Sequence, residues 1–503
     1  MDNAEVRTRI APSPTGYFHL GNARTALFNW LFAKKNHGQF ILRVEDTDRL
    51  RSREEYELDM EEALTWLGLS WDEGPETPDL HGPYRQSERL EIYKKYIKQL
   101  LDSGSAYHCY CTPEELEAER KDQEAKKLPP KYSGKCRNLS SELVKKYEAE
   151  GRQTAVRFKV PLGQKIKFKD LAKGPMEFDS TLISDFIIQK QNGDSMFLFC
   201  NVIDDAEMKI THVIRGEDHL SNTPKQIMMA EAMNLMMPEY AHLSMILNPD
   251  RTKLSKRKNP TSVTRDYRDQ GYLPEALINF MAFLGWTPAR HEKKQTIVGG
   301  PDDNTEFFTL DELINEFDLS DVGKSPAIFN KDKLDFLNGY YIRQMPLGEL
   351  AKRCLPYLEK ADLVVEKKSV QNGEKVLSVI SLVQERMKKL SEVAELTSFF
   401  FKKPDYKVEL LIPKKSSQDI TVKALTETHR VLSEENDYSL DSIEQLLRAL
   451  ANKLNVSSGE VLWPVRVALS GKDASPGVFE LISHFGKEET LTRIQTAIDK
   501  LKS

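Results

Sequence analysis

The residues best suited to chemistry near the start of the chain are a histidine and a glycine at the mouth of a predicted helix. Residues 9–32, RIAPSPTGYFHLGNARTALFNWLF, predict a short strand, a Pro-rich turn with His19 and Gly21 after it, and then the helix. A helix N-terminus offers unpaired N–H groups and a partial positive charge, which suit a phosphate. Gly21 leaves room for a ligand, and His19 can donate to a phosphate oxygen. An ordinary strand-to-helix turn with a surface histidine explains the same spacing equally well.

A second stretch, NPDRTKLSKRKNP at residues 248–260, concentrates basic residues in a Pro-bounded loop. The loop follows Met245-Ile246-Leu247, which predicts a strand. Most charge runs are solvated surface, and this one is open to that interpretation. The loop and the opening stretch together favour fewer functions than either stretch does alone.

The elements that position these residues are predicted from hydrophobic periodicity. One face of the first helix carries apolar residues at helical spacing, and these are Ala23, Ala26, Leu27, Trp30 and Leu31. Residues 40–44 then predict a buried strand, which makes a strand-helix-strand unit and therefore a parallel sheet. Residues 196–200 and 212–215 again predict strands, so the sheet is expected to be interrupted by an insertion. Beyond about residue 335, leucine and isoleucine stripes predict helices.

Composition limits the class of protein. The chain has 503 residues, 40% of them hydrophobic and 30% charged, with a net charge of −5. Five cysteines in so long a chain do not form a disulfide framework, which favours a reducing, cytoplasmic location. No apolar run is long enough to cross a bilayer, so no membrane partner is expected. The net negative charge does not exclude a nucleic-acid partner, because a large protein can carry local basic patches.

Taken together, PSPTGxxHxG and KLSKR resemble the two signature sequences of class I aminoacyl-tRNA synthetases. The resemblance is closest to the glutamyl branch, of bacterial and organellar type, and continues through most of the chain. It is carried in order by LRVEDTD (42–48), GPYRQSER (82–89), THVIRGEDHLSNTP (211–224), YLPEALINF (272–280), FNKDKLDFLNGYYI (329–342) and VRVALSGKDASPGVFELISHFGKE (465–488).

The resemblance implies an α/β fold with a Rossmann-like catalytic domain split by an insertion. A connecting domain and an all-helical anticodon-binding region would follow. The expected boundaries are 1–109 and 191–250 for the two catalytic halves, 110–190 for an inserted acceptor-stem-binding domain, 251–335 for the KLSKR loop and stem-contact region, and 336–503 for the helical region. A glutaminyl-tRNA synthetase shares the catalytic motifs but carries β-barrel anticodon domains. A nucleotidyltransferase that charges no tRNA remains a further alternative.

The implied reaction is the activation of L-glutamate with ATP and Mg²⁺. Glutamyl-adenylate forms, diphosphate leaves, and the glutamyl group passes to the 3′-terminal adenosine of tRNA(Glu). Positioning and charge stabilisation should dominate such catalysis. The resemblance assigns catalysis to His19, Gly21, Lys253, Ser255 and Lys256. It assigns ATP contacts to Ser13, His19, Gly21, Glu217, Leu254 and Lys256.

Glutamate brings two carboxylates and one ammonium, and the matching positions suit them chemically. Arg9 and Arg215 are expected to bind the carboxylates, because a guanidinium fits a carboxylate bidentately. Glu45 is the expected partner of the ammonium. The remaining substrate positions carried over are Ala11, Ser13, Phe197 and Asn201. Phe197 departs from the family pattern, which commonly has tyrosine there.

Three cysteines in the insertion, Cys109, Cys111 and Cys136, have a spacing that some relatives use for zinc. Those relatives complete the site two residues after the third cysteine, where this chain has Asn138, a poor zinc ligand. His108 or a water is a possible substitute. Buried reduced thiols are the alternative.

Basic residues predict where tRNA binds. Lys126, Lys127 and Lys131 lie in a Lys/Arg-rich stretch of the insertion that would suit an RNA backbone. Solvated helix surface is the other interpretation of that stretch. Arg386 lies near the position where relatives place an anticodon-discriminating arginine. The enzyme is expected to be a monomer.

Overall fold

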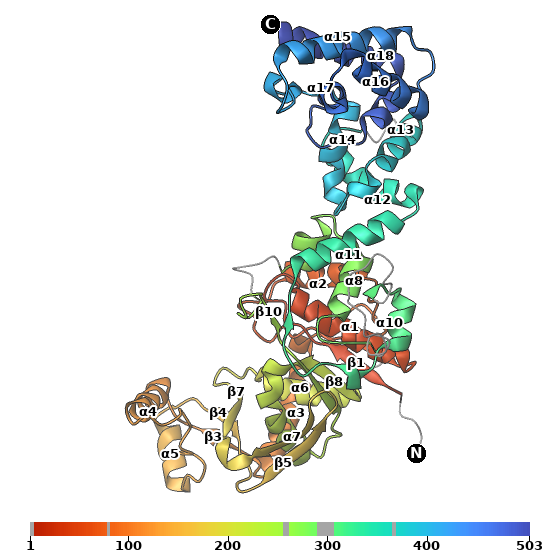
Figure 1. Ribbon diagram of the computed structural model, residues 1–503. Helices are drawn as coiled ribbons and strands as arrows, with labels where there is room; N and C mark the ends of the chain where they lie inside the picture. The colour runs from red at the N-terminus through yellow and green to blue at the C-terminus, as the bar shows by residue number, and fades with distance from the viewer. Residues whose placement is uncertain (1–4, 78–80, 255–260, 289–305, 365–368) are drawn as a thin grey trace. The chain divides into compact units, whose positions relative to one another are not determined.

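The computed structural model describes residues 5–77, 81–254, 261–288, 306–364 and 369–503, which form two compact units (Figure 1). The first unit comprises residues 1–269 and 274–334, and the second comprises residues 270–273 and 335–503. In the described part of the chain, no helix combines the length and the apolar character needed to cross a membrane.

The predicted strand-helix-strand unit opens the first compact unit. Strand β1 (Arg7–Ile10) leads through the Pro-rich turn to helix α1 (Leu20–Lys35) and then to β2 (Gln39–Leu42), which pairs in parallel with β1. The helix forms because its apolar stripe at 23–31 is buried against the sheet. Both the helix and the parallel pairing confirm the sequence prediction.

A second sheet, which contains strands from beyond the insertion, lies beside this pair. β8 (His212–Gly216) pairs in parallel with β9 (Glu239–Leu243). β8 also lies beside β1, because the backbone N–H of Thr211 donates to the carbonyl of Arg7 at 2.9 Å. The carboxyl ends of β1, β2 and β8 therefore meet at one edge of the sheet, which is where ligands bind in open α/β folds.

The strand predicted at 196–200 is wrong. Residues from Phe197 onward form helix α6 (Phe197–Glu207). A short apolar run fits a strand or a buried helix equally well. The polar residues that follow, Asn201, Asp204 and Asp205, lie at helical spacing from Phe197, and all three are buried. The signal for a helix therefore lay in the polar residues.

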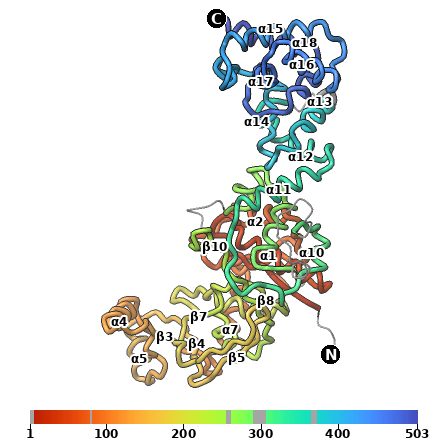
Figure 2. The backbone as a smooth tube through the Cα atoms, in the orientation of Figure 1, coloured from red at the N-terminus to blue at the C-terminus, as the bar shows by residue number. Residues whose placement is uncertain are grey.

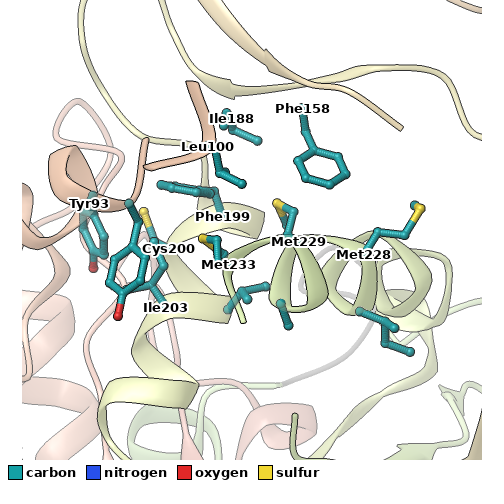
Figure 3. Close-up of a cluster of buried hydrophobic side chains, with 14 of the residues drawn as sticks. Tyr93, Leu100, Phe158, Ile188, Phe199, Cys200, Ile203, Met228, Met229 and Met233 are labelled. Carbon is teal, nitrogen blue, oxygen red and sulfur yellow. The ribbon is translucent and has the colours of Figure 1, made fainter. Parts of the chain in front are cut away.

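A hydrophobic core beneath the sheet fixes the helices (Figure 3). It joins α3 (Leu90–Asp102), α6 and α7 (Thr223–Met233), with Phe199, Cys200 and Met229 almost inaccessible to solvent. Because Phe199 and Cys200 point into this core, α6 turns Asn201 and Asp205 toward the sheet edge. Cys354, in the second unit, is likewise inaccessible to solvent.

The insertion follows α3 in the chain and ends before α6, within the orange to yellow part of the tube in Figure 2. Strands β3 (Ala106–Cys109), β4 (Ala155–Phe158) and β7 (Phe186–Gln189) form an antiparallel sheet. Helices α4 (Pro113–Ala125) and α5 (Ser141–Ala149) lie between β3 and β4 in the chain. A hairpin of β5 (Lys165–Asp170) and β6 (Gly174–Asp179) extends the β8–β9 sheet, since Asp170 pairs with Tyr240 of β9.

The remaining elements of the first unit flank the sheet. They are α2 (Glu54–Trp66), α8 (Pro274–Ala282), α10 (Leu310–Glu316) and the short parallel pair β10 (Ile246–Leu247) and β11 (Ala327–Ile328). The chain enters the second unit along α11 (Lys331–Gln344).

The described residues of the second unit are helical, as predicted (Figure 1). Its helices are α12 (Leu347–Lys360), α13 (Ser369–Ser381), α14 (Val393–Phe401), α15 (Gln418–Glu434), α16 (Leu440–Leu454), α17 (Ser458–Ser470) and α18 (Val478–Lys502). Ile443 and Leu447 of α16 and Ile494 and Ile498 of α18 are buried in one core.

Candidate active site

A cavity of about 350 Å³ opens at the carboxyl ends of the strands. Residues from β1, α1, α6 and β8 line it together with the segment that follows β10. Among the residues singled out from the sequence, those that line the cavity are Arg9, Ala11, His19, Gly21, Glu45, Phe197, Asn201, Arg215, Lys253 and Leu254.

Two described residues with roles expected from the resemblance, Ser13 and Glu217, do not line the cavity. Ser13 is exposed on the Pro-rich turn. Glu217 accepts a hydrogen bond from the backbone of Met245 at 2.9 Å and pairs with Lys173 at 2.6 Å. Ser255 and Lys256 lie outside the described residues.

The opening motif forms a helix N-terminus, as predicted. His19 is the N-cap of α1, and its Nδ1 accepts a hydrogen bond from the N–H of Gly21 at 2.9 Å. A Cβ at position 21 would lie 3.3 Å from this Nδ1, closer than ordinary contact, so only glycine leaves the ring in place. The other N–H groups of the first turn also have partners, Leu20 with Thr261 and both Asn22 and Ala23 with the carbonyl of His19. The N-terminus of α1 therefore offers the cavity its partial positive charge, with no side chain at position 21 to cover it.

Backbone hydrogen bonds bring the second motif to the first. The N–H of Leu20 donates to Thr261 at 2.8 Å, and the N–H of Val263 donates to Phe18 at 3.0 Å. Lys253 and Leu254, on the other side of the loop, line the cavity. The described flanks of the KLSKR loop thus meet the mouth of α1.

A network of buried charges surrounds Arg9. Its Nε donates to Asp205 at 3.1 Å, and Arg43 donates to the same oxygen at 2.7 Å. Burial opposes the ionisation of Asp205, but the two arginines hold its pKa below the usual value. Arg9 is thereby fixed between β1 and α6.

A second layer of polar groups supports this network. Asp204 accepts hydrogen bonds from Arg89 at 2.7 Å and from Gln86 at 2.8 Å. Gln86 also donates to Asn201 at 3.1 Å. The motif GPYRQSER therefore supplies residues that hold the polar face of α6, a role that was not expected from the sequence.

Glu45, which lines the cavity beside this network, has unused bonding capacity. Its Oε1 is buried and makes no hydrogen bond within the described residues, and Arg43 Nη2 lies 3.5 Å away. Burial raises the pKa of Glu45 to about 8. A cationic group entering the cavity would favour the carboxylate form and complete its bonding.

Arg215, at the end of β8, has different surroundings. Its Nη2 donates to Thr223 at 2.8 Å and to Gln226 at 2.6 Å. Arg215 forms no ion pair with a carboxylate anywhere in the described part of the chain. Burial lowers the pKa of Arg215 to about 10, so the side chain is still a cation at neutral pH.

Arg24 and His219 also line the cavity, and sequence reasoning missed both. Arg24 lies on the buried face of α1 and donates to the carbonyls of Leu284 and Ser244. Burial lowers the pKa of Arg24 to about 10. The sequence signal that could have identified Arg24 is its position beside the apolar stripe of the predicted helix. His219 lies 5.8 Å from the ring of Phe197, and burial lowers its pKa.

The three insertion cysteines come together, as the zinc hypothesis requires. The sulfur atoms of Cys109, Cys111 and Cys136 lie within 4.8 Å of one another. Asn138 and His108 are exposed, but the hydroxyl of Tyr132 lies 3.6 Å from Cys109 Sγ and 3.8 Å from Cys111 Sγ. Hydrogen bonds from the neighbouring thiols and from Arg157 lower the pKa of Cys109.

The basic stretch of the insertion is more balanced than its lysines suggest. Helix α4 carries many acids, and Lys126 pairs with Asp122 at 2.7 Å. Lys131 donates to the carbonyl of Thr181 at 2.6 Å, and Lys127 is exposed. In the second unit, Arg386 is exposed on a short helical turn, Gln384–Arg386.

Comparisons with known proteins define the class. Residues 5–336 match the family described as "tRNA synthetases class I (E and Q), catalytic domain", and residues 349–498 match "Anticodon binding domain". The chain thus has the two parts of a class I tRNA synthetase, in that order.

Full-length relatives identify the branch. A glutamate–tRNA ligase of Symbiobacterium thermophilum is 45% identical over 97% of this chain and 99% of its own length. One of Carboxydothermus hydrogenoformans is 44% identical over the same shares. A solved glutamate tRNA ligase from Elizabethkingia meningosepticum, in complex with its amino acid, superposes with a TM-score of 0.86 at 36% identity, covering 99% of this chain and 100% of that one. The chain belongs to the glutamate–tRNA ligase family.

Proposed function

We propose that the protein charges tRNA(Glu) with L-glutamate, using ATP and Mg²⁺ and releasing AMP and diphosphate. Glutamate would occupy the inner end of the cavity, between β1, α6 and β8. ATP would lie toward the N-terminus of α1.

The observation that carries the substrate assignment is the balance of buried charge at the inner end. With Glu45 in the carboxylate form that the bound ammonium favours, three arginines other than Arg215 face three carboxylates: Arg9, Arg43, Arg89, Glu45, Asp204 and Asp205. Arg215 adds a positive charge that no carboxylate of the described chain pairs with. Glutamate carries two carboxylates and one ammonium, so its net charge of about −1 completes the balance. Glutamine, which is neutral overall, would not.

Within this pocket, each charged group of glutamate has a partner. Arg9 would bind the side-chain carboxylate and Arg215 the α-carboxylate. Glu45, with its unbonded oxygen, would accept the ammonium. Asn201 and Phe197 would line the aliphatic part, and the Phe197 ring offers no hydroxyl to the substrate.

The outer end of the cavity suits ATP. The partial positive charge at the N-terminus of α1 would attract phosphate oxygens. His19, Lys253 and the buried Arg24 would add positive or donor groups around them. From its position in KLSKR, Lys256 is proposed to stabilise charge on the phosphates as the carboxylate attacks.

A second cavity, of about 450 Å³, supports a route for the tRNA end. It shares Phe197 with the first cavity and is lined by Arg157, Asn222 and Lys225. Donors and cations suit a phosphodiester backbone. We therefore place the 3′ end of tRNA here, the acceptor stem against the insertion, and the anticodon on the second unit.

The thiol cluster fits a structural zinc ion held by Cys109, Cys111 and Cys136. Ligand atoms about 2.3 Å from a tetrahedral zinc lie roughly 3.8 Å apart, close to the spacing found here. Tyr132 supplies the fourth donor that Asn138 does not. Zinc here would stabilise the insertion, and about one equivalent of metal should copurify with the protein. Metal-free, fully active protein would identify the cluster as plain thiols.

The proposed activity is tested by charging separate purified tRNAs with labelled glutamate in the presence of ATP and Mg²⁺. We expect tRNA(Glu) to be charged and unrelated tRNAs to remain uncharged. The same assay with tRNA(Gln) defines the tRNA range. Failure to charge tRNA(Glu) would contradict the proposal.

A further inference from the structure

A buried aspartate–histidine pair lies behind Arg215, outside the cavity. Asp170 comes from strand β5 of the insertion, and His242 comes from β9. Both side chains are inaccessible to solvent, and Asp170 Oδ2 lies 2.5 Å from His242 Nδ1. The other oxygen of Asp170 accepts hydrogen bonds from the backbone N–H groups of Ala172, Lys173 and His242, at 2.8–3.3 Å.

The opposite side of the His242 ring contacts the pocket arginine. Its Nε2 lies 3.3 Å from Nε of Arg215 and 3.0 Å from Oγ1 of Thr223. An arginine Nε–H can only donate, so His242 Nε2 must accept and carries no proton. The ring proton is then on Nδ1, where Asp170 accepts it. One arrangement of protons therefore satisfies the whole chain of contacts.

We propose that Asp170 and His242 are positioning residues that orient the Arg215 guanidinium for the substrate carboxylate. The inference rests on the proposed function for the role of Arg215. It makes the insertion part of the amino-acid pocket, because the residue that fixes the proton of His242 lies on the inserted hairpin.

The backbone supports this coupling between the insertion and the pocket. The N–H of Leu171 donates to the carbonyl of Tyr240 at 2.8 Å, which fixes the hairpin to β9. Lys173, two residues further, pairs with Glu217 just beyond β8. The hairpin turn therefore contacts both strands that carry the relay.

Neutral support has a chemical consequence for Arg215. Thr223, Gln226 and His242 hold three of its N–H groups without neutralising its charge. A carboxylate in the place of His242 would orient the guanidinium equally well but would compete with the substrate. A histidine whose proton is held by a more distant aspartate avoids that competition.

Replacing Asp170 with asparagine tests this arrangement sharply. An amide has one accepting and one donating end, whereas both oxygens of Asp170 accept. If the NH₂ group faced the backbone, it would meet three N–H donors. It should therefore face His242, whose Nδ1 must then accept, so that the proton moves to Nε2 and points at Arg215.

The test variant is Asp170→Asn, with Asp179→Asn as the matched control on the same hairpin. Asp179 is exposed and bonds only locally, to Thr181. We expect Asp170→Asn to raise the KM for glutamate about tenfold, the loss for a misaligned charge-assisted contact, with the KM for ATP unchanged. The control should change neither. An unchanged KM for glutamate, or an equal rise in both KM values, would overturn the inference.

A second measurement uses the wild-type protein and does not require that Asp170→Asn folds. Nitrogen NMR of histidine-labelled wild-type protein, with His242 assigned from His242→Asn, reports which ring nitrogen carries the proton. The proton on Nδ1 supports the inference, and the proton on Nε2 overturns it. Normal use of glutamate by Arg215→Gln would overturn the proposed role of Arg215 itself. Normal use by Asp170→Asn beside an impaired Arg215→Gln would overturn only the positioning role.

Discussion

The two arginines of the amino-acid pocket are buried to the same degree but are held in opposite ways. Arg9 donates to Asp205, which Arg43 also contacts, so its charge is part of an ionic network. Arg215 is held by neutral acceptors. The Arg9 end of the pocket is therefore built mainly from paired charges, whereas the Arg215 end keeps a positive charge for the ligand.

The largest effect should follow from removing the centre of the ionic network. Arg43 is fully buried among three carboxylates. Arg43→Met should lower the free energy of unfolding by about 3–5 kcal/mol, because it removes the cation that three buried carboxylates share. Urea denaturation measures this, and Arg120→Met, which breaks exposed pairs on α4, is the control, with less than about 1 kcal/mol expected. Equal losses of unfolding free energy in the two variants would contradict the idea that the buried network contributes more than exposed ion pairs.

The two pocket arginines should separate stability from function. Arg9→Gln and Arg215→Gln should each reduce kcat/KM for glutamate by about 10²-fold or more, since each removes a charge-assisted contact. Only Arg9→Gln should also destabilise the protein, because Asp205 loses a partner, whereas removing Arg215 relieves an unpaired buried charge.

Thermal unfolding and steady-state charging, measured on the same preparations, check this pair of variants. Equal stability losses would mean that Arg215 is as firmly built into the fold as Arg9. Near-normal use of glutamate by either variant would remove that arginine from the pocket.

The pH dependence of glutamate binding should report Glu45. Its pKa of about 8 in the free protein means that the carboxyl is protonated below that pH. Binding an ammonium requires the carboxylate, so a proton must leave as glutamate binds. The KM for glutamate should therefore fall about tenfold per unit as pH rises toward 8 and then level off. Glu45→Gln should bind weakly and without this dependence, and a flat wild-type profile would contradict the assignment.

The smallest effect is expected at the exposed lysines of the insertion. Replacing Lys126, Lys127 and Lys131 together should barely change the free energy of unfolding, because all three side chains are exposed and the Lys126–Asp122 pair is solvated. The affinity for tRNA should fall less steeply with salt. Each phosphate contact contributes about 0.7–0.9 to the slope of log affinity against log salt concentration, so losing three contacts should reduce the slope by about 2. Filter binding at several salt concentrations measures the slope. An unchanged slope would leave this stretch as solvated surface.

The sequence predicts residues better than it predicts their support. His19, Glu45 and Arg215 each follow or end a predicted strand or begin a helix, and the fold brings them together because parallel strands end at one edge. Asp170 and His242 could not be paired in this way. One lies on an inserted hairpin and the other on a strand far along the chain, and only the tertiary fold makes them neighbours.

Two local errors have similar causes. The apolar run at 196–200 gave no periodicity by which a helix could be told from a strand. Tyr132 was overlooked beside the cysteines because its hydroxyl reaches them through the fold of the loop after α4. The roles of Ser255 and Lys256 still rest on the KLSKR motif.

The central claim is that the pocket selects an amino acid with a second carboxylate. Its most direct test is the ratio of kcat/KM for glutamate and glutamine, measured with the wild-type protein and tRNA(Glu). The buried Arg9 would face the neutral amide of glutamine and leave donors unpaired, so glutamate should be preferred by at least about 10²-fold. A ratio near one would contradict the pocket described here.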